Sequence, residues 1–167
     1  MSFLRTFLGT TIAALLVAGP ASATELRLED FFQGRTTATG SFRSITGLRR
    51  QFDVVLHGRW TGKTLVLRED FRYADGERDT KTWRFRKTGP KTYVGTREDV
   101  IGETKVRLDG NSAYFSYRVD LDPGEKRNVV RFHDRLELSD DGRRIANTAW
   151  VFKGLLPVAR VRVDFRR

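Results

Sequence analysis

Apolar and polar positions alternate along most of the chain, most clearly over Lys63–Arg86. A period of two is typical of a β-strand that buries one face. The apolar face of this stretch consists of Leu65, Leu67, Phe71, Tyr73, Trp83 and Phe85. Turn residues at Ala74–Glu77 divide the stretch in two, which predicts a long β-hairpin. Glu69 has the parity of the apolar residues, so we expect its carboxylate to point into the core.

The same alternation predicts about ten strand segments joined by short turns. They are Arg35–Arg43, Leu48–Trp60, the two halves of the hairpin, Thr92–Glu98, Glu103–Leu108, Ala113–Asp120, Asn128–Leu138, Ile145–Lys153 and Val158–Phe165. An apolar stripe at Leu26–Phe32 predicts about one or two helical turns before them. No helix is long enough for a βαβ crossover, and a long twisted sheet avoids free edges by closing. We therefore predict an all-β, antiparallel up-and-down barrel of about 8–10 strands, with a two-sheet sandwich as the alternative.

Residues 1–23 have the organisation of a secretory signal peptide. A short basic start precedes the apolar run Phe7–Val17, a Gly-Pro break and the small-x-small site Ala21–Ala23. The apolar run is shorter than the about 20 residues that span a bilayer. We expect cleavage at this site, a single mature domain at 24–167 and a location in the periplasm. Because Thr24 follows the site and the chain has no cysteine, we expect neither a lipid anchor on cysteine nor disulfides.

The chain carries a formal net charge of +10. Its basic residues form no tract; they alternate with apolar residues, as at Arg84/Arg86 and Arg160/Arg162. This is the pattern of the solvated face of a sheet. We therefore predict no nucleic-acid partner and a weak contact with the anionic head groups of a membrane surface. The pattern leaves the oligomeric state open.

Motifs for metal, nucleotide and nucleophile chemistry are missing from the sequence. The two histidines, His57 and His133, lie far apart and have the parity of the solvent face. A zinc site needs about three or four converging ligands, and the chain has no cysteine to supply them. No glycine-rich loop opens a helix, and no serine lies in a nucleophile elbow. We predict no metal, no cofactor and no assigned catalytic residue.

Polar residues on apolar faces are the remaining candidates. Glu69, Asp134 and Asn147 share parity with buried-type neighbours, and Arg97 is a candidate counter-charge. A buried carboxylate costs several kcal/mol unless it has a partner. Three interpretations stay open: a structural network that fixes strand register, an anchor for a ligand at the floor of a cavity, or a general acid/base pair whose pKa burial raises.

Aromatic side chains on the predicted inner faces supply large flat surfaces. They either fill the core or line a slot for an acyl chain or another apolar molecule. Together with the polar candidates they give a predicted ligand-binding set of Glu69, Phe71, Tyr73, Trp83, Arg97, Asp134 and Asn147.

Several short motifs resemble those of one known family. They are Phe31-Phe32-x-Gly34, Gly40-x-Phe42, Gly58-x-Trp60-x-Gly62, Leu65-x-Leu67-x-Glu69-x-Phe71-x-Tyr73-x-Asp75-Gly76, Asp99-Val100-x-Gly102, Gly110-Asn111, Asp134, Asn147 and Val151-x-Lys153-Gly154. Over nearly all of the mature chain they resemble the bacterial envelope proteins catalogued as domain of unknown function 3833. Many members look like lipoproteins with a cysteine at the cleavage site, where this chain has Ala23-Thr24. The resemblance implies a calycin-type barrel, a fold that mostly binds hydrophobic ligands, and no established activity.

These patterns favour a periplasmic, lipocalin-like barrel that binds a small apolar or amphipathic, lipid-like ligand. One alternative is a barrel enzyme that modifies such a lipid through Glu69 and Asp134. Another is a non-catalytic envelope scaffold with a solid core.

Overall fold

The computed structural model of the chain describes residues 24–122 and 128–167, so the predicted signal peptide lies outside the described residues. One helix and ten strands form within those two ranges. They are α1 (Leu28–Phe32), β1 (Gly34–Ser44), β2 (Arg49–Trp60), β3 (Thr64–Tyr73), β4 (Arg78–Gly89), β5 (Thr92–Thr96), β6 (Thr104–Asp109), β7 (Ser112–Asp120), β8 (Val129–Leu138), β9 (Arg144–Lys153) and β10 (Leu156–Arg166). None of the helical structure in these ranges is long and apolar enough to cross a membrane.

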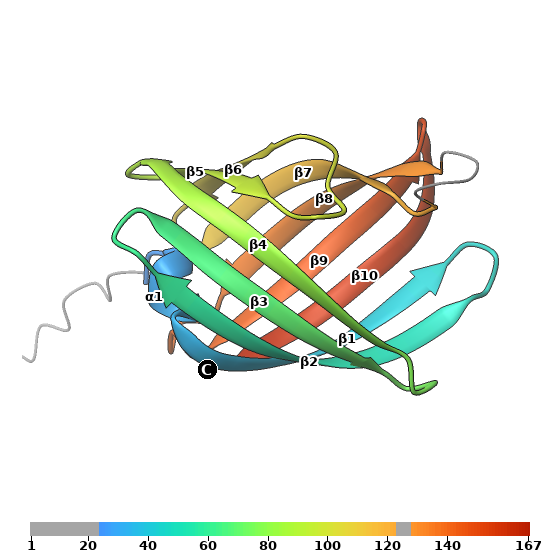
Figure 1. Cartoon of the computed structure of the whole chain (residues 1–167), viewed down its shortest axis with the longest axis horizontal. Helices are drawn as coiled ribbons and strands as arrows, with labels where there is room; N and C mark the ends of the chain where they lie inside the picture. The colour runs from blue at the N-terminus through green and yellow to red at the C-terminus, as the bar shows by residue number, and fades with distance from the viewer. Residues whose placement is uncertain (1–23, 123–127) are drawn as a thin grey trace, which may run out of the picture.

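Every strand pairs antiparallel with the next strand in sequence, and β1 closes the sheet by pairing with β10 (Figure 1). The closing register runs from Thr37↔Arg166 to Ser44↔Ala159. The prediction of an up-and-down barrel is confirmed, and the two-sheet sandwich is wrong because no strand edge stays free to separate two sheets. The predicted strand bounds hold to within a few residues. One difference affects a candidate residue: β5 ends at Thr96 instead of Glu98, which places Arg97 in the connection to β6.

The alternation of the strands decides which side chains fill the barrel. On β3, Leu65 and Leu67 are buried, and Glu69 follows with the same parity and 8% of its surface exposed. The facing residues of β4, Trp83 and Phe85, are buried as well, and their rings stack at a centroid distance of 4.9 Å. The predicted inward position of Glu69 is therefore correct.

The segment that contains α1 closes one end of the barrel, on the left in Figure 1. Its side chains Leu26, Leu28, Phe31 and Phe32 are all buried. Phe32 meets Phe165 of β10 edge to face at 5.3 Å, and the Leu26 N–H donates to the Gly110 carbonyl. A helix of this length is not stable on its own in water. The packing of its apolar face on the barrel therefore keeps α1 folded.

A buried carboxylate on α1 also fixes the helix to the sheet. Glu29 accepts hydrogen bonds from the Lys87 ammonium of β4 and the Tyr93 hydroxyl of β5. Burial raises the pKa of Glu29, but the hydrogen bonds from Lys87 and Tyr93 outweigh burial and hold the pKa below its ordinary value. The charge at this end of the barrel is therefore fully partnered.

Gly58 of β2 allows the helix to approach the sheet closely. Gln33, at the end of α1, forms a parallel bridge with Gly58. A Cβ atom added at Gly58 would lie 1.8 Å from the Phe32 carbonyl oxygen, far inside van der Waals contact. Only glycine is compatible with this approach.

We expect Gly58→Ala to push α1 away from its seat and to lower the free energy of unfolding by roughly 1–3 kcal/mol. Urea denaturation followed by circular dichroism measures the change. Arg59→Ala on the exposed face of the same strand is the matched control, expected to change stability by about 0.5 kcal/mol or less. Equal stabilities of the two variants would show that α1 does not depend on this contact.

Candidate functional site

The end of the barrel opposite α1 is less completely filled. Inward-facing apolar side chains near this end pack on the core but stay only partly buried; they are Phe42, Phe71, Tyr73, Phe132 and Val161. Partial exposure of inward-facing residues means that water reaches the interior from this end. The predicted residues Phe71 and Tyr73 thus line the entrance.

Arg97 is the centre of a polar cluster below this entrance. Its guanidinium binds Asp99 through two nitrogens, with Nε–Oδ1 and Nη2–Oδ2 distances of 2.6 and 3.1 Å. Its Nη1 lies 3.9 Å from a carboxylate oxygen of Glu69. The same guanidinium lies over the rings of Trp83 and Tyr117, at 4.7 and 5.5 Å from their centroids. Two carboxylates and two aromatic faces therefore compensate its desolvation.

Lys81 extends the cluster toward the entrance. Its ammonium lies 3.0 Å from Asp99 and 3.0 Å from Asp79. Burial raises the pKa of Asp99, but Arg97 and Lys81 outweigh burial and hold the pKa below its ordinary value. Asp99 thus stays ionised and links the two cations.

Asp134 and Asn147 form the least satisfied part of the interior. The Asn147 side-chain amide donates to Asp134 Oδ1 over 2.7 Å. Asn147 Oδ1 is buried and accepts no hydrogen bond from the described residues, and Asp134 Oδ2 is buried without a hydrogen bond of regular geometry. The Tyr117 hydroxyl lies close enough to the Asp134 carboxylate to lower its pKa as a hydrogen-bond donor. Buried oxygens without a donor are rare in folded proteins because each carries a desolvation cost. The two acceptors on adjoining residues indicate a position that a donor from outside the chain can fill.

Burial raises the pKa values of both inner carboxylates. Desolvation raises the pKa of Glu69 to about 7, although Arg97 partly offsets it. Desolvation also raises the pKa of Asp134 to about 6, against the hydrogen bond from Asn147, the charge of Arg97 and the hydrogen bond from Tyr117. Glu69 therefore changes its protonation near neutral pH.

The structure brings most of the predicted site residues together. Glu69, Trp83 and Arg97 are in direct contact or ion-pair range, and the charge of Asp134 acts on Glu69. Phe71 and Tyr73 lie nearer the entrance and pack on Phe52.

Sequence reasoning missed two charged members of the cluster. Lys81 shares the parity of Trp83 and Phe85, so the rule that selected Glu69 also selects Lys81. Asp99 follows the last residue of β5 in an irregular connection, where parity gives no signal. No group of three or more acidic or histidine side chains in the described ranges could hold a metal ion.

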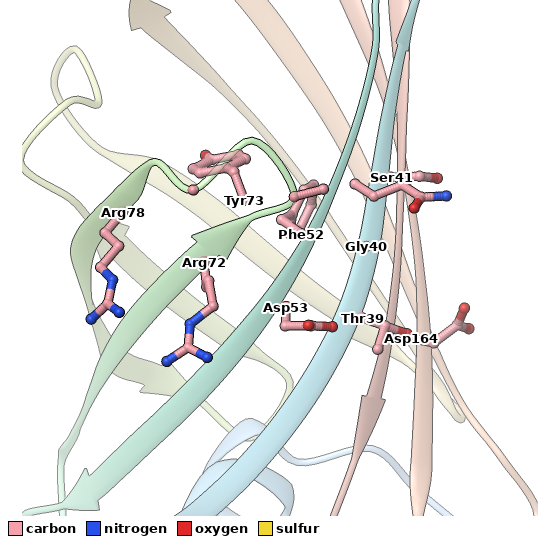
Figure 2. A pocket seen from close by; sticks show the side chains of 12 residues that line it. Thr39, Gly40, Ser41, Phe52, Asp53, Arg72, Tyr73, Arg78 and Asp164 are labelled. Carbon is pink, nitrogen blue, oxygen red and sulfur yellow. The ribbon is translucent and has the colours of Figure 1, made fainter.

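A separate hollow of about 760 Å³ lies beside the entrance (Figure 2). Its polar lining crosses four neighbouring strands, with Asp164, Thr39, Asp53 and Arg72 at successive register positions. These side chains have the outward parity, opposite to Phe52. The hollow is open to this outer face, Phe52 and Tyr73 also line it, and it does not include the Arg97 cluster.

A family model for proteins of unknown function, DUF3833, matches residues 14–167. The chain belongs to this family. A search of curated proteins finds no match.

Two solved structures share the barrel of this DUF3833 protein. Rv2717c from M. tuberculosis is 16% identical, with 89% of this chain and 98% of that chain covered and a TM-score of 0.60. The S-type phycobiliprotein lyase CPES from Guillardia theta is 8% identical, with 88% and 95% covered and a TM-score of 0.57. At these identities the likeness establishes a lipocalin-like fold.

The raised pKa of Glu69 gives stability a defined pH dependence. Between pH 4.5 and about 7 the folded protein keeps a proton on Glu69 that the unfolded chain releases. The free energy of unfolding should therefore fall by roughly 2–3 kcal/mol as the pH rises through this range, relative to Glu69→Gln, which cannot ionise. Urea denaturation of both proteins from pH 4.5 to 8 measures the difference. A difference that does not vary with pH would show that Glu69 keeps an ordinary pKa.

Proposed function

We propose that this barrel binds a small apolar or amphipathic ligand, lipid-like in character, which enters at the end opposite α1. The observation that carries the proposal is a pair of buried acceptors: Asn147 Oδ1, which has no donor among the described residues, and Asp134 Oδ2, near which the Tyr117 hydroxyl is the available donor. A hydrogen bond from a ligand would remove the cost of leaving them unpaired. Small-molecule sites combine mostly apolar walls with a few convergent polar groups of this kind.

The chemistry of these two atoms defines the polar end of the ligand. Both are acceptors, since the Asn147 amide nitrogen already donates to Asp134. The ligand must therefore present a donor such as a hydroxyl, an amine or an N–H group. A ligand carboxylate would bring further acceptor oxygens to Asp134 and Asn147, so a free fatty acid with its acid group innermost is a poor fit.

The entrance supplies a surface for the apolar part of the ligand. Tyr117 and Phe132 stack in parallel at 5.2 Å, and Phe71 and Tyr73 stack at 6.1 Å on the other side. Tyr117 is buried, whereas Phe71, Tyr73 and Phe132 are partly exposed and gain contact area when an apolar molecule covers them.

Acid–base catalysis on such a lipid is a second candidate function. It is favoured by the pKa of Glu69 at about 7, in the range in which a carboxylate both accepts and donates protons at neutral pH. Catalysis would make turnover disappear in Glu69→Gln while ligand affinity is retained. A pure binding protein shows no turnover in either form.

Two neutral probes of equal shape test the binding proposal. N-phenyl-1-naphthylamine has one N–H donor, and 1-benzylnaphthalene has a methylene in its place. We expect Asp134→Leu to lower the affinity for the amine probe by roughly 10-fold or more and the affinity for the hydrocarbon probe by about 2-fold or less. Fluorescence titration measures both affinities, and Asp53→Asn on the outer face is the control variant.

Failure of both probes to bind the wild-type protein would count against an accessible interior. Equal weakening of the two probes by Asp134→Leu would count against a hydrogen bond at this position. Urea denaturation of each variant separates either result from a loss of folding.

We further propose that the protein acts in the periplasm without a lipid anchor. The sequence pattern of residues 1–23 and the threonine at position 24 support this location. The mature protein should begin at Thr24 and be released by osmotic shock, as N-terminal sequencing of that fraction would show. Recovery of the uncut chain with the inner membrane would contradict the proposal.

A further inference from the structure

Three arginines stand directly opposite one another across the barrel seam. Arg43 of β1 pairs in register with Arg49 of β2 on one side and with Arg160 of β10 on the other. Like charges at directly opposed positions destabilise a sheet. Within residues 24–122 and 128–167, none of the three has an ion-pair partner. The fold thus keeps an unfavourable row of positive charge that an anion from outside would stabilise.

The row opens into a groove of about 340 Å³ on the outer face of β1, β9 and β10. Arg43, Arg160 and Arg162 line it together with Trp150, and no carboxylate does. The guanidinium of Arg160 lies 5.0 Å from the centre of the Trp150 ring, and its Nε is buried without a hydrogen-bond acceptor among the described residues. Guanidinium groups bind phosphate oxygens in a two-pronged geometry, so the groove fits a phosphate group.

Exposed apolar side chains lie beside this groove, on the turns at the open end of the barrel. Ile45 and Leu48 on the β1–β2 turn are 73% and 54% exposed, and Leu155 and Leu156 on the β9–β10 turn are 95% and 69% exposed. The Ile45 N–H donates to the Val158 carbonyl, so the β1–β2 turn begins beside β10. Both turns lie at the end opposite α1 (Figure 1). Four large apolar side chains at this end of the barrel are therefore exposed, two on each turn.

We propose that this corner of the barrel docks on a lipid bilayer that contains anionic phospholipid. The arginine groove binds lipid phosphates, and the tips Ile45, Leu48, Leu155 and Leu156 insert among the acyl chains. The combination selects a bilayer over a dissolved anion, because only a bilayer offers phosphates and hydrocarbon side by side. Trp150 then lies at the level of the head groups, where tryptophan is enriched in membrane proteins.

Docking in this orientation turns the open end of the barrel toward the lipid. The inference does not depend on the interior site, because the arginine groove and Trp150 are on the outer face. If the proposed ligand is lipid-like, it enters from the membrane instead of from water.

Vesicle sedimentation tests the proposal with vesicles of phosphatidylcholine that contain about one third phosphatidylglycerol. The double variant Arg43→Gln/Arg162→Gln should lower the partition coefficient by roughly 10- to 30-fold, since each basic residue near an anionic surface contributes a factor of about 5. Arg84→Gln/Arg86→Gln removes the same charge from the exposed face of β4 and should lower the partition coefficient by about 3-fold or less.

The double variant Ile45→Ser/Leu155→Ser should lower the partition coefficient by roughly 10-fold. It should also abolish the binding that the wild-type protein keeps at 0.5 M salt, a concentration that screens charges.

If Arg43→Gln/Arg162→Gln and Arg84→Gln/Arg86→Gln lower the partition coefficient equally, the proposal is overturned. That result would show that the net charge attracts the protein to the vesicles without a specific site. Binding of free glycerophosphoglycerol as strong as binding of vesicles would overturn it in favour of a dissolved anion. A concentration-dependent dimer that disappears in Ile45→Ser/Leu155→Ser would overturn it in favour of a second copy of the chain. In every variant, an unchanged circular dichroism spectrum and urea midpoint verify the fold, so the result is independent of the outcome for the interior site.

Discussion

One guanidinium inside the barrel compensates most of the charge that the strand pattern buries. Arg97 reaches the interior from an irregular connection and contacts Asp99, Glu69, Trp83 and Tyr117. Removing it would leave carboxylates in a low-dielectric interior with Lys81 as the remaining cation of the cluster, and an uncompensated buried charge is among the most costly defects in a folded protein. The pKa values of Glu69, Asp99 and Asp134 therefore all depend on this side chain.

The buried carboxylates at the α1 end and in the middle of the barrel have pKa values shifted in opposite directions. At the α1 end, Glu29 is paired with Lys87 and Tyr93, and its pKa is lowered. In the middle of the barrel, the pKa values of Glu69 and Asp134 are raised, and Asn147 retains a buried oxygen without a donor among the described residues. The five-residue helix closes the end at which the buried carboxylate is fully paired. The proposed ligand site lies where the pairing is incomplete.

The sequence predicted the facing of the strands well, because a period of two is a strict geometric rule. Glu69 and Asp134 were assigned to the interior by parity alone, and both are buried there. Parity fails outside the strands, so the direction of Arg97 was ambiguous and the role of Asp99 was not seen. The role of Glu29 was also missed, since a single helical turn has no periodicity that would mark its partners on β4 and β5. The arginine row appeared in the sequence as ordinary solvated positions; its meaning depends on the register of β1, β2 and β10.

The seam between β1 and β10 also has a consequence for how the molecule is made. The first strand finds its second partner only when the last strand has been synthesised, because Thr37 pairs with Arg166 at the end of the chain. Joining segments so distant in sequence carries a large loop-closure entropy, which makes the final step of folding slow. Until that step, both β1 and β9 present open edges that can pair with other chains. A product that ends before β10 should therefore aggregate, and a chaperone that covers the edge of β1 would protect the nascent protein.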